Sequence, residues 1–158
     1  MEIFISPSKG EMNLQELVLD MLAYVSEDTS FAYKLIVGSD SHPCLDGTCF
    51  VSAIIIHRQS KGARYYYKKQ TQSRIDSISQ RIFLEAAFSL ELADRLRIGL
   101  KEHDREDMKV EIHLDVGTHG ATRDLVKDVI GMVVGSGFDA RIKPDASGAS
   151  KVADRYTR

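Results

Sequence analysis

The sequence lacks the features that define several large protein classes. Lys and Arg total 21 against 23 Asp and Glu, so the formal net charge of −2 excludes a protein that coats nucleic acid through bulk positive charge. An enzyme with a local basic groove stays compatible, because clustered acids lower the total. No apolar run approaches the roughly 20 residues needed to cross a bilayer. The first residues carry an acid, Glu2, and no basic segment typical of a signal peptide. We therefore expect a cytoplasmic protein without a membrane segment.

Cysteine is also scarce. The two cysteines, Cys44 and Cys49, are close in sequence and fall in a segment that we expect to be a polar loop. Together with His42 they offer three zinc ligands, but no fourth ligand follows at the spacing of a zinc motif. A disulfide is not expected in a reducing compartment. We interpret both residues as incidental thiols.

Length and apolar periodicity predict one α/β domain covering residues 1–158. A helix is expected after Asn13, and a longer one from Ser77 to about Lys101. Asn13 and Ser77 are both plausible N-caps. Two further helices are expected at 121–134 and 151–156, and strands at 35–40, 49–57, 63–69, 110–116 and 140–143. The first three strands are too closely connected for a parallel crossover. The expected architecture is a five-stranded mixed sheet, with three antiparallel strands followed by parallel ones, flanked by helices and preceded by an extra N-terminal helix.

Asp40 draws attention because it follows the apolar run Leu35–Val37. Such a run, bounded by turn-forming residues, is typical of a strand buried on both faces. An acid at the end of that strand is held on a rigid element, and desolvating its charge is unfavourable unless it has a partner. The simpler interpretation is that Asp40 caps the following turn.

Three more acids fall where folding can bring them to Asp40. Glu85 lies in the long helix, Asp115 at the end of the fourth strand and Asp154 in the last helix. Oxygen-only clusters of this kind suit Mg²⁺ or Mn²⁺. Two such ions about 3.5–4 Å apart can activate a water and stabilise the leaving oxygen of a phosphodiester. Without a cation, crowded carboxylates should raise the pKa of at least one member.

Each acid also has an ordinary structural interpretation. Glu85 follows Arg81 by one helical turn, so the two can form a surface ion pair. Asp115 can belong to a simple turn, and Asp154 can pair with its neighbour on a helix surface. The mostly apolar neighbours of Glu85 at helical spacing favour it as the functional acid. The same helix offers two alternatives, Glu91 and Asp94.

Histidines and lysines are the next candidates. Two histidines lie two residues from a proposed acidic ligand, on the same strand face, and can add imidazole ligands: His42 and His113. His119, in a Gly-Thr-His-Gly segment, can shuttle a proton near neutral pH. Lys143 and Lys151 flank the proposed site in sequence and can hold a substrate phosphate.

Several separated motifs carry a family resemblance. They are Phe4-Ile-Ser-Pro-Ser-Lys-Gly10, Gly38-Ser-Asp-Ser-His42, His113-Leu-Asp-Val-Gly117, Gly131-Met-Val-Val-Gly-Ser-Gly-Phe138 and Lys143-Pro-Asp-Ala-Ser-Gly-Ala-Ser-Lys-Val-Ala-Asp154. Across nearly the whole chain they resemble the YkuK-like family of small bacterial proteins, which is grouped with the ribonuclease H-like fold. The resemblance implies a five-stranded mixed sheet with acids on strand one, the first long helix, strand four and the last helix. The residues in those places are Asp40, Glu85, Asp115 and Asp154.

These observations favour a nuclease or related phosphodiesterase that depends on Mg²⁺ or Mn²⁺ and acts on nucleic acid. Asp40, Glu85, Asp115 and Asp154 are its expected ligands and catalytic acids. Two alternatives stay open, because the same fold also serves other functions. One is a catalytically silent module that binds nucleic acid or protein, and the other is a phosphohydrolase of small molecules. Neither composition nor motifs indicate an oligomeric state.

Overall fold

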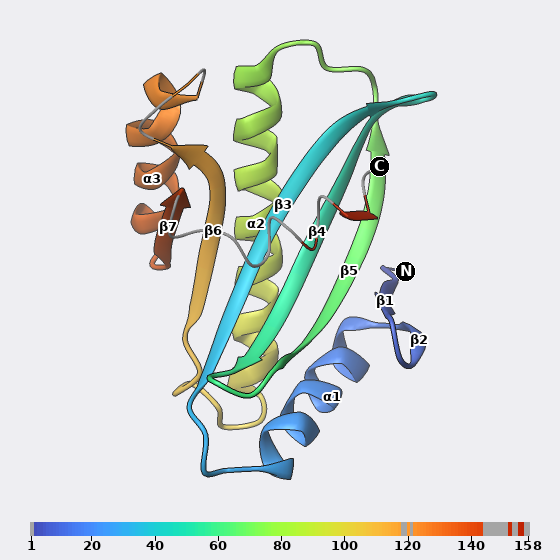
Figure 1. Cartoon of the computed structure of the whole chain (residues 1–158), viewed down its shortest axis with the longest axis vertical. Helices are drawn as coiled ribbons and strands as arrows, with labels where there is room; N and C mark the ends of the chain where they lie inside the picture. Colours follow the sequence, from blue (N-terminus) through green and yellow to red (C-terminus); the bar gives the residue numbers. More distant parts are fainter. Residues whose placement is uncertain (1, 118–119, 121, 144–151, 153–154, 157–158) are drawn as a thin grey trace.

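The computed structural model describes residues 2–117, 120, 122–143, 152, 155 and 156. Within these residues the chain forms one seven-stranded mixed sheet in the order β2-β1-β5-β4-β3-β6-β7 (Figure 1). The strands are β1 Phe4–Ser6, β2 Gly10–Met12, β3 Tyr33–Cys44, β4 Gly47–Arg58, β5 Ala63–Gln72, β6 Val110–Gly117 and β7 Asp139–Lys143. Strands β3, β4 and β5 form the expected antiparallel meander, and β6 and β7 continue the sheet parallel to β3.

The expected number of five strands is wrong, because a short N-terminal hairpin extends the sheet. Strands β1 and β2 pair with each other from Phe4↔Met12 to Ser6↔Gly10, and β1 joins β5 at Ile5↔Tyr67. Each strand has three residues, too few to show an alternating pattern in the sequence. The Phe4 side chain is fully buried, so the hairpin contributes to the core.

Strand β3 is longer than its apolar run predicts. It continues beyond Asp40 to Cys44, because β4 provides a full set of partners, including Asp40↔Val51 and His42↔Cys49. Asp40 therefore lies within the strand and not at its end. Cys49 belongs to β4, as the strand expected at 49–57 predicts, but Cys44 ends β3, so the two cysteines flank a tight hairpin turn and do not lie in a polar loop.

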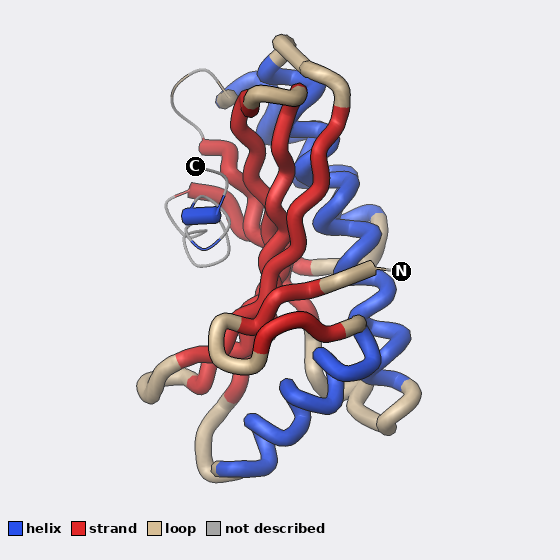
Figure 2. The backbone as a smooth tube through the Cα atoms, turned by 90° about the vertical axis from the view of Figure 1, so that its right-hand side faces the viewer, coloured by secondary structure: helices blue, strands red, loops and turns tan. Residues whose placement is uncertain are grey.

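Three helices pack on one face of the sheet (Figure 2). Helix α1 (Leu14–Glu27) begins with a capping box between Asn13 and Glu16, and α2 (Ile78–Lys101) begins at Ser77, whose side chain accepts from the Gln80 amide. Both N-cap predictions are confirmed. Helix α3 (Val126–Gly135) starts later than expected, after a 3₁₀ turn at Arg123–Leu125. The expected helix at 151–156 lies mostly outside the described residues.

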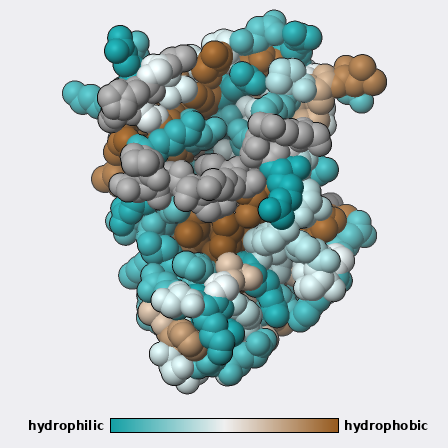
Figure 3. Space-filling model, viewed as in Figure 1, coloured by the Kyte–Doolittle hydropathy of each residue, from teal (hydrophilic) through white to brown (hydrophobic). Residues whose placement is uncertain are grey.

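The main core lies between the sheet and these helices. Leu35 and Val37 of β3 point into it, as do Ile112 and Leu114 of β6. The alternate residue of β3, Ile36, faces the other side of the sheet, where Ile55, Tyr65 and Val152 pack around it. Apolar atoms are visible in the middle of this second face (Figure 3). No helix in the described part of the chain is long and apolar enough to span a membrane.

Candidate active site

Three of the four predicted acids line one groove. Asp40 comes from β3, Glu85 from α2 and Asp115 from β6, and the groove between them has a volume of about 340 Å³. It lies at the carboxyl ends of the parallel strands β3 and β6, beside the N-terminal half of α2 (Figure 1). In open α/β sheets this is where ligands bind. The fourth acid, Asp154, lies outside the described residues, as do Lys151 and His119.

Glu85 is the most perturbed member of the group. Its side chain is buried, with 9% exposure, and accepts a hydrogen bond of 2.5 Å from Ser41 Oγ. Burial raises the pKa of Glu85 to about 8, and the negative charges of Asp40 and Asp115 add to the rise against the opposing effect of the Ser41 hydrogen bond. Glu85 is therefore mostly protonated at pH 7. Burial is the main cause of this raised pKa, and the crowding of carboxylates without a cation adds to it.

A serine network fixes the distance between β3 and α2 beneath the groove. Ser39 Oγ lies 2.8 Å from Ser52 Oγ on β4 and 2.8 Å from Ser89 Oγ on α2. All three hydroxyls are buried, so each needs the partner that the network provides. Ser89 is one turn after Glu85, and Ser41 is two residues after Ser39. The same strand face and the same helix face therefore hold both the network and the Ser41–Glu85 hydrogen bond.

Asp40 is almost fully buried and lies beside His42. The distance from Asp40 Oδ2 to His42 Nε2 is 3.3 Å, within ion-pair range when the imidazole is protonated. The predicted pairing of these two side chains on one strand face is therefore present in the structure. His42 also lines the groove, so its imidazole lies within the candidate site.

Asp115 has a cationic partner. Lys143, the last residue of β7, places Nζ 2.8 Å from Asp115 Oδ1. An irregularity between β6 and β7 shifts the register after His113, so that Lys143 pairs with Gly117. The hydrogen bond to Asp115 raises the pKa of Lys143, and the charges of Asp115, Asp40 and Glu85 raise it further. Lys143 thus adds a positive charge to the lining of an acidic groove.

His113 does not join the groove in the way that its spacing suggests. Its Nε2 lies 3.1 Å from Glu111 Oε1 in place of the expected partnership with Asp115. Lys34 and Arg141 also bind Glu111, at 3.4 and 3.6 Å. Burial lowers the pKa of the His113 imidazole, against the opposing effect of Glu111. This ionic cluster links β3, β6 and β7.

The structure separates Glu85 from the alternative acids on α2. Glu91 is 66% exposed and lies 3.9 Å from Arg95, whereas Asp94 lies 2.6 Å from Arg97, and neither lines the groove. Only Glu85 of the three is buried against β3. Helical spacing alone could not make this choice, because α2 carries apolar residues around most of its circumference.

Arg81 is a functional candidate that the sequence interpretation missed. It lines the groove one helical turn before Glu85, but among the described residues it forms no ion pair with Glu85. Its Nε atom is buried and has no hydrogen-bond partner in the described part of the chain. A guanidinium N–H without an acceptor is suited to a phosphate or carboxylate oxygen. The sequence signal for Arg81 was its position four residues before Glu85, because this spacing places the two side chains on the same face of a helix.

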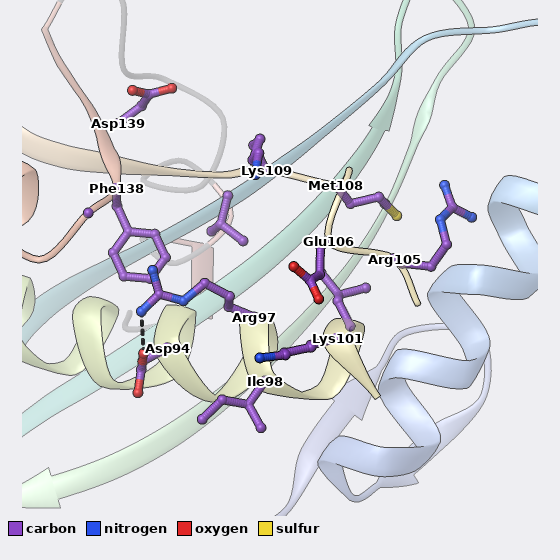
Figure 4. A pocket seen from close by; sticks show the side chains of 13 residues that line it. Asp94, Arg97, Ile98, Lys101, Arg105, Glu106, Met108, Lys109, Phe138 and Asp139 are labelled. Atoms are coloured by element: carbon purple, nitrogen blue, oxygen red, sulfur yellow. Dashed lines mark hydrogen bonds and ion pairs between the residues drawn. The ribbon is translucent and has the colours of Figure 1, made fainter. Parts of the chain in front are cut away.

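A larger pocket, of about 630 Å³, lies at the opposite end of α2 (Figure 4). Its charged side chains have both signs, and several are already paired. Arg97 donates to Asp94 and stacks over the Phe138 ring at 4.4 Å, while Arg105 binds Asp107 through two hydrogen bonds. Of the predicted site residues and their alternatives in the described part of the chain, only Asp94 lines this pocket, and it is already paired with Arg97. Its size therefore does not make it the stronger functional candidate.

The acidic groove suits a hard divalent cation in its chemistry. Three carboxylates from three elements surround it, and oxygen ligands are those that Mg²⁺ and Mn²⁺ prefer. The pKa of Glu85 is raised mainly by burial, and a cation at this position would favour its ionised form. As they stand, however, no three His, Cys, Asp or Glu side chains among the described residues are grouped to hold a metal ion. The donors fit the cation, but the carboxylates do not yet converge on one point.

Comparisons with known proteins agree with the fold. The family model described as "Ribonuclease H-like" matches residues 16–158. A protein of Bacillus subtilis (strain 168) named "Uncharacterized protein YkuK" is 34% identical over 167 residues, covering 99% of this chain and 97% of the relative. No solved structure gives a significant match.

Proposed function

The chain belongs to the YkuK-like family of ribonuclease H-like proteins, and we propose that it is a nuclease or related phosphodiesterase that uses Mg²⁺ or Mn²⁺. The observation that carries the proposal is the meeting of Asp40, Glu85 and Asp115 in one groove. These residues are separated by 45 and 30 positions in the sequence, and only folding brings them together. Fold analogy alone would not select this function, because related folds also serve as scaffolds.

Each acid has a distinct proposed role. Asp40 and Asp115 would share the cation, Glu85 would be a further ligand, and Asp154, outside the described residues, would complete the set. When bound, the cation supplies the Lewis acid that activates a water and stabilises the leaving oxygen. The Ser41 hydroxyl orients Glu85 through its hydrogen bond. Loss of the Glu85 proton then accompanies cation binding, because a nearby positive charge favours the carboxylate.

The substrate phosphate is held by cationic side chains of the groove. Arg81 offers its unpartnered Nε–H from the helix side, and Lys143 offers an ammonium from the β7 side. Both contacts recognise phosphate oxygens and position the backbone without reading bases. Nucleic acid is therefore the proposed partner. The proposed location of the protein is the cytoplasm.

A catalytically silent binding module is the alternative that one observation favours. Lys143 already neutralises Asp115, so the groove is stable as an ion-pair network without a cation. A module of this kind would need neither Mn²⁺ nor an ionised Glu85. Phosphohydrolysis of a small molecule is a further variant of the metal-dependent proposal, and a chromogenic phosphate ester tests it directly.

Cleavage assays on defined substrates distinguish these functions. Single-stranded, double-stranded and hybrid oligonucleotides are incubated with Mg²⁺, Mn²⁺ or a chelator. We expect cation-dependent cleavage that falls by at least about 100-fold in Asp40→Asn, since a removed ligand or catalytic group has an effect of that order. Asp128→Asn, at an exposed position of α3, is the matched control and should cleave normally. Equal cleavage by wild type and Asp40→Asn would remove Asp40 from the mechanism, and no cleavage of any substrate would favour the silent module.

A further inference from the structure

We propose that the Lys143 ammonium is the counter-ion of the acidic groove in the cation-free protein, and that a divalent cation has to displace it from Asp115. The inference rests on the proposed function, because it concerns how the same groove accepts its cation. It assigns to Lys143 a role in regulating metal binding, in addition to its proposed contact with substrate.

The contacts of Lys143 support this role. Its Nζ is 2.8 Å from Asp115 Oδ1, and its charge also interacts with that of Asp40 and, once Glu85 ionises, with that of Glu85. Lys143 lines the groove together with all three carboxylates and contacts one of them, Asp115. A divalent cation bound by Asp115 would lie close to Nζ, where two positive charges repel each other. The lysine and the cation thus compete for the same carboxylates.

The position of Lys143 allows it to leave. The side chain is 57% exposed and extends from the last residue of β7, at the edge of the sheet. A lysine side chain has a flexible four-carbon stem and loses few packing contacts when it moves away from such an exposed site. Neither β6 nor β7 has to shift. Release of the ammonium also frees its three donors for a substrate phosphate.

Arg81 does not compete in the same way. It lines the opposite side of the groove and makes no ion pair with Glu85 among the described residues. The charge of Arg81 lowers the pKa of Glu85, but among the described residues no ion pair between the two has to break when a cation enters. Of the two cationic side chains, Lys143 is therefore the one whose removal should strengthen cation binding, even though Lys143 is also proposed to contact the substrate.

Calorimetric titration with Mn²⁺ tests the competition. The proteins are wild type, Lys143→Met and Lys127→Met, the last at an exposed position of α3 as a control for the loss of one charge. A unit charge within about 4–6 Å moves a carboxyl pKa by about 1–3 units, so its removal should lower the Kd for Mn²⁺ by about tenfold or more. The control should stay within about twofold, because distant surface charges are screened. An equal or higher Kd for Lys143→Met than for wild type would overturn the proposal.

Direct observation of the lysine provides a second test that needs no substitution. The side-chain ammonium of Lys143 in the wild-type protein is followed by nitrogen NMR while Mg²⁺ is added. We expect its signal to move toward that of a free lysine as the site fills. A signal that stays unchanged at saturating Mg²⁺ would show that the ammonium keeps its contact with Asp115, and the proposal would fail.

The two proposals fail in different ways. If wild type binds Mn²⁺ and Lys143→Met binds it no more tightly, the role of Lys143 as a competitor is wrong, and the proposed metal-dependent function stands. If neither protein binds Mn²⁺, the metal-dependent function itself is wrong, and the competition falls with it. Tighter binding by Lys143→Met supports both.

Discussion

Replacing Glu85 by Gln should stabilise the protein at alkaline pH, although it removes a proposed ligand. The pKa of Glu85 is about 8 in the fold because of its burial, against an ordinary value of 4.5. The folded protein therefore holds this proton more tightly than the unfolded chain does. The resulting stabilisation is fully present below about pH 4.5 and is lost as the pH rises through about 8.

The size of the effect follows from the shift. At about 1.4 kcal/mol per pKa unit, a rise from 4.5 to about 8 corresponds to about 5 kcal/mol of unfolding free energy lost by the time Glu85 is fully ionised. Gln has the same shape, accepts the Ser41 hydrogen bond through its Oε1 and carries no charge to desolvate. We therefore expect the stability of Glu85→Gln relative to wild type to increase by several kcal/mol between pH 5 and pH 9.

Urea denaturation at a series of pH values measures this difference. A chelator keeps the protein free of divalent cations, and the free energy of unfolding is obtained at each pH. Titrating groups that do not interact with Glu85 contribute equally to both proteins and cancel in the difference. Glu91→Gln, exposed on the same helix, is the control and should follow the wild-type profile. Parallel profiles for Glu85→Gln and wild type would refute the conclusion that Glu85 is protonated at neutral pH because of its burial.

Two further substitutions test other parts of the structure. Arg81→Gln should raise KM for a cleavable oligonucleotide by about tenfold, because a charged phosphate contact is lost. The Kd for Mn²⁺, measured by calorimetry, should not rise. A KM equal to that of wild type would exclude the phosphate contact. Asp20→Asn should lower the free energy of unfolding by about 3 kcal/mol in urea, because buried Asp20 accepts from Tyr66 and Lys9 and pairs with Arg64 at 3.3 Å. A loss below about 0.5 kcal/mol would show that this network, which joins α1 to β5, does not stabilise the fold.

The sequence predicted those features that depend on local chemistry. Asn13 and Ser77 begin helices because their side chains accept backbone hydrogen bonds within the same turn. The Asp46-Gly47 pair, typical of a hairpin turn, lies between β3 and β4, where Gly47 has a φ of +145°. Features that depend on a distant partner were missed. The polar half of β3 is a strand because β4 pairs with it, and the β1–β2 hairpin is held by β5.

The candidate site likewise contains features that the sequence predicted and features that depend on distant partners. Alternation along β3 placed Asp40 and His42 on one face, and their side chains do meet. The partner of Asp115 was not predictable, because it depends on the irregular register between β6 and β7 that places Lys143 opposite Gly117. The choice of Glu85 over Glu91 and Asp94 required the packing of α2 on β3. Spacing within one element determines which side chains share a face, whereas only the assembled sheet determines which faces meet.

The groove is made of side chains that a purely structural interface would not need. Serine hydroxyls occupy the contact between β3 and α2, where apolar groups would pack without requiring partners. Glu85 beside them is protonated at neutral pH and destabilises the fold when it ionises. A divalent cation would reverse that penalty, so Mg²⁺ should stabilise wild type more at pH 9 than at pH 5 and should stabilise Glu85→Gln less. A silent module gains nothing from an acid in this state, which is why the pH dependence of cation binding separates the two functions even before a substrate is known.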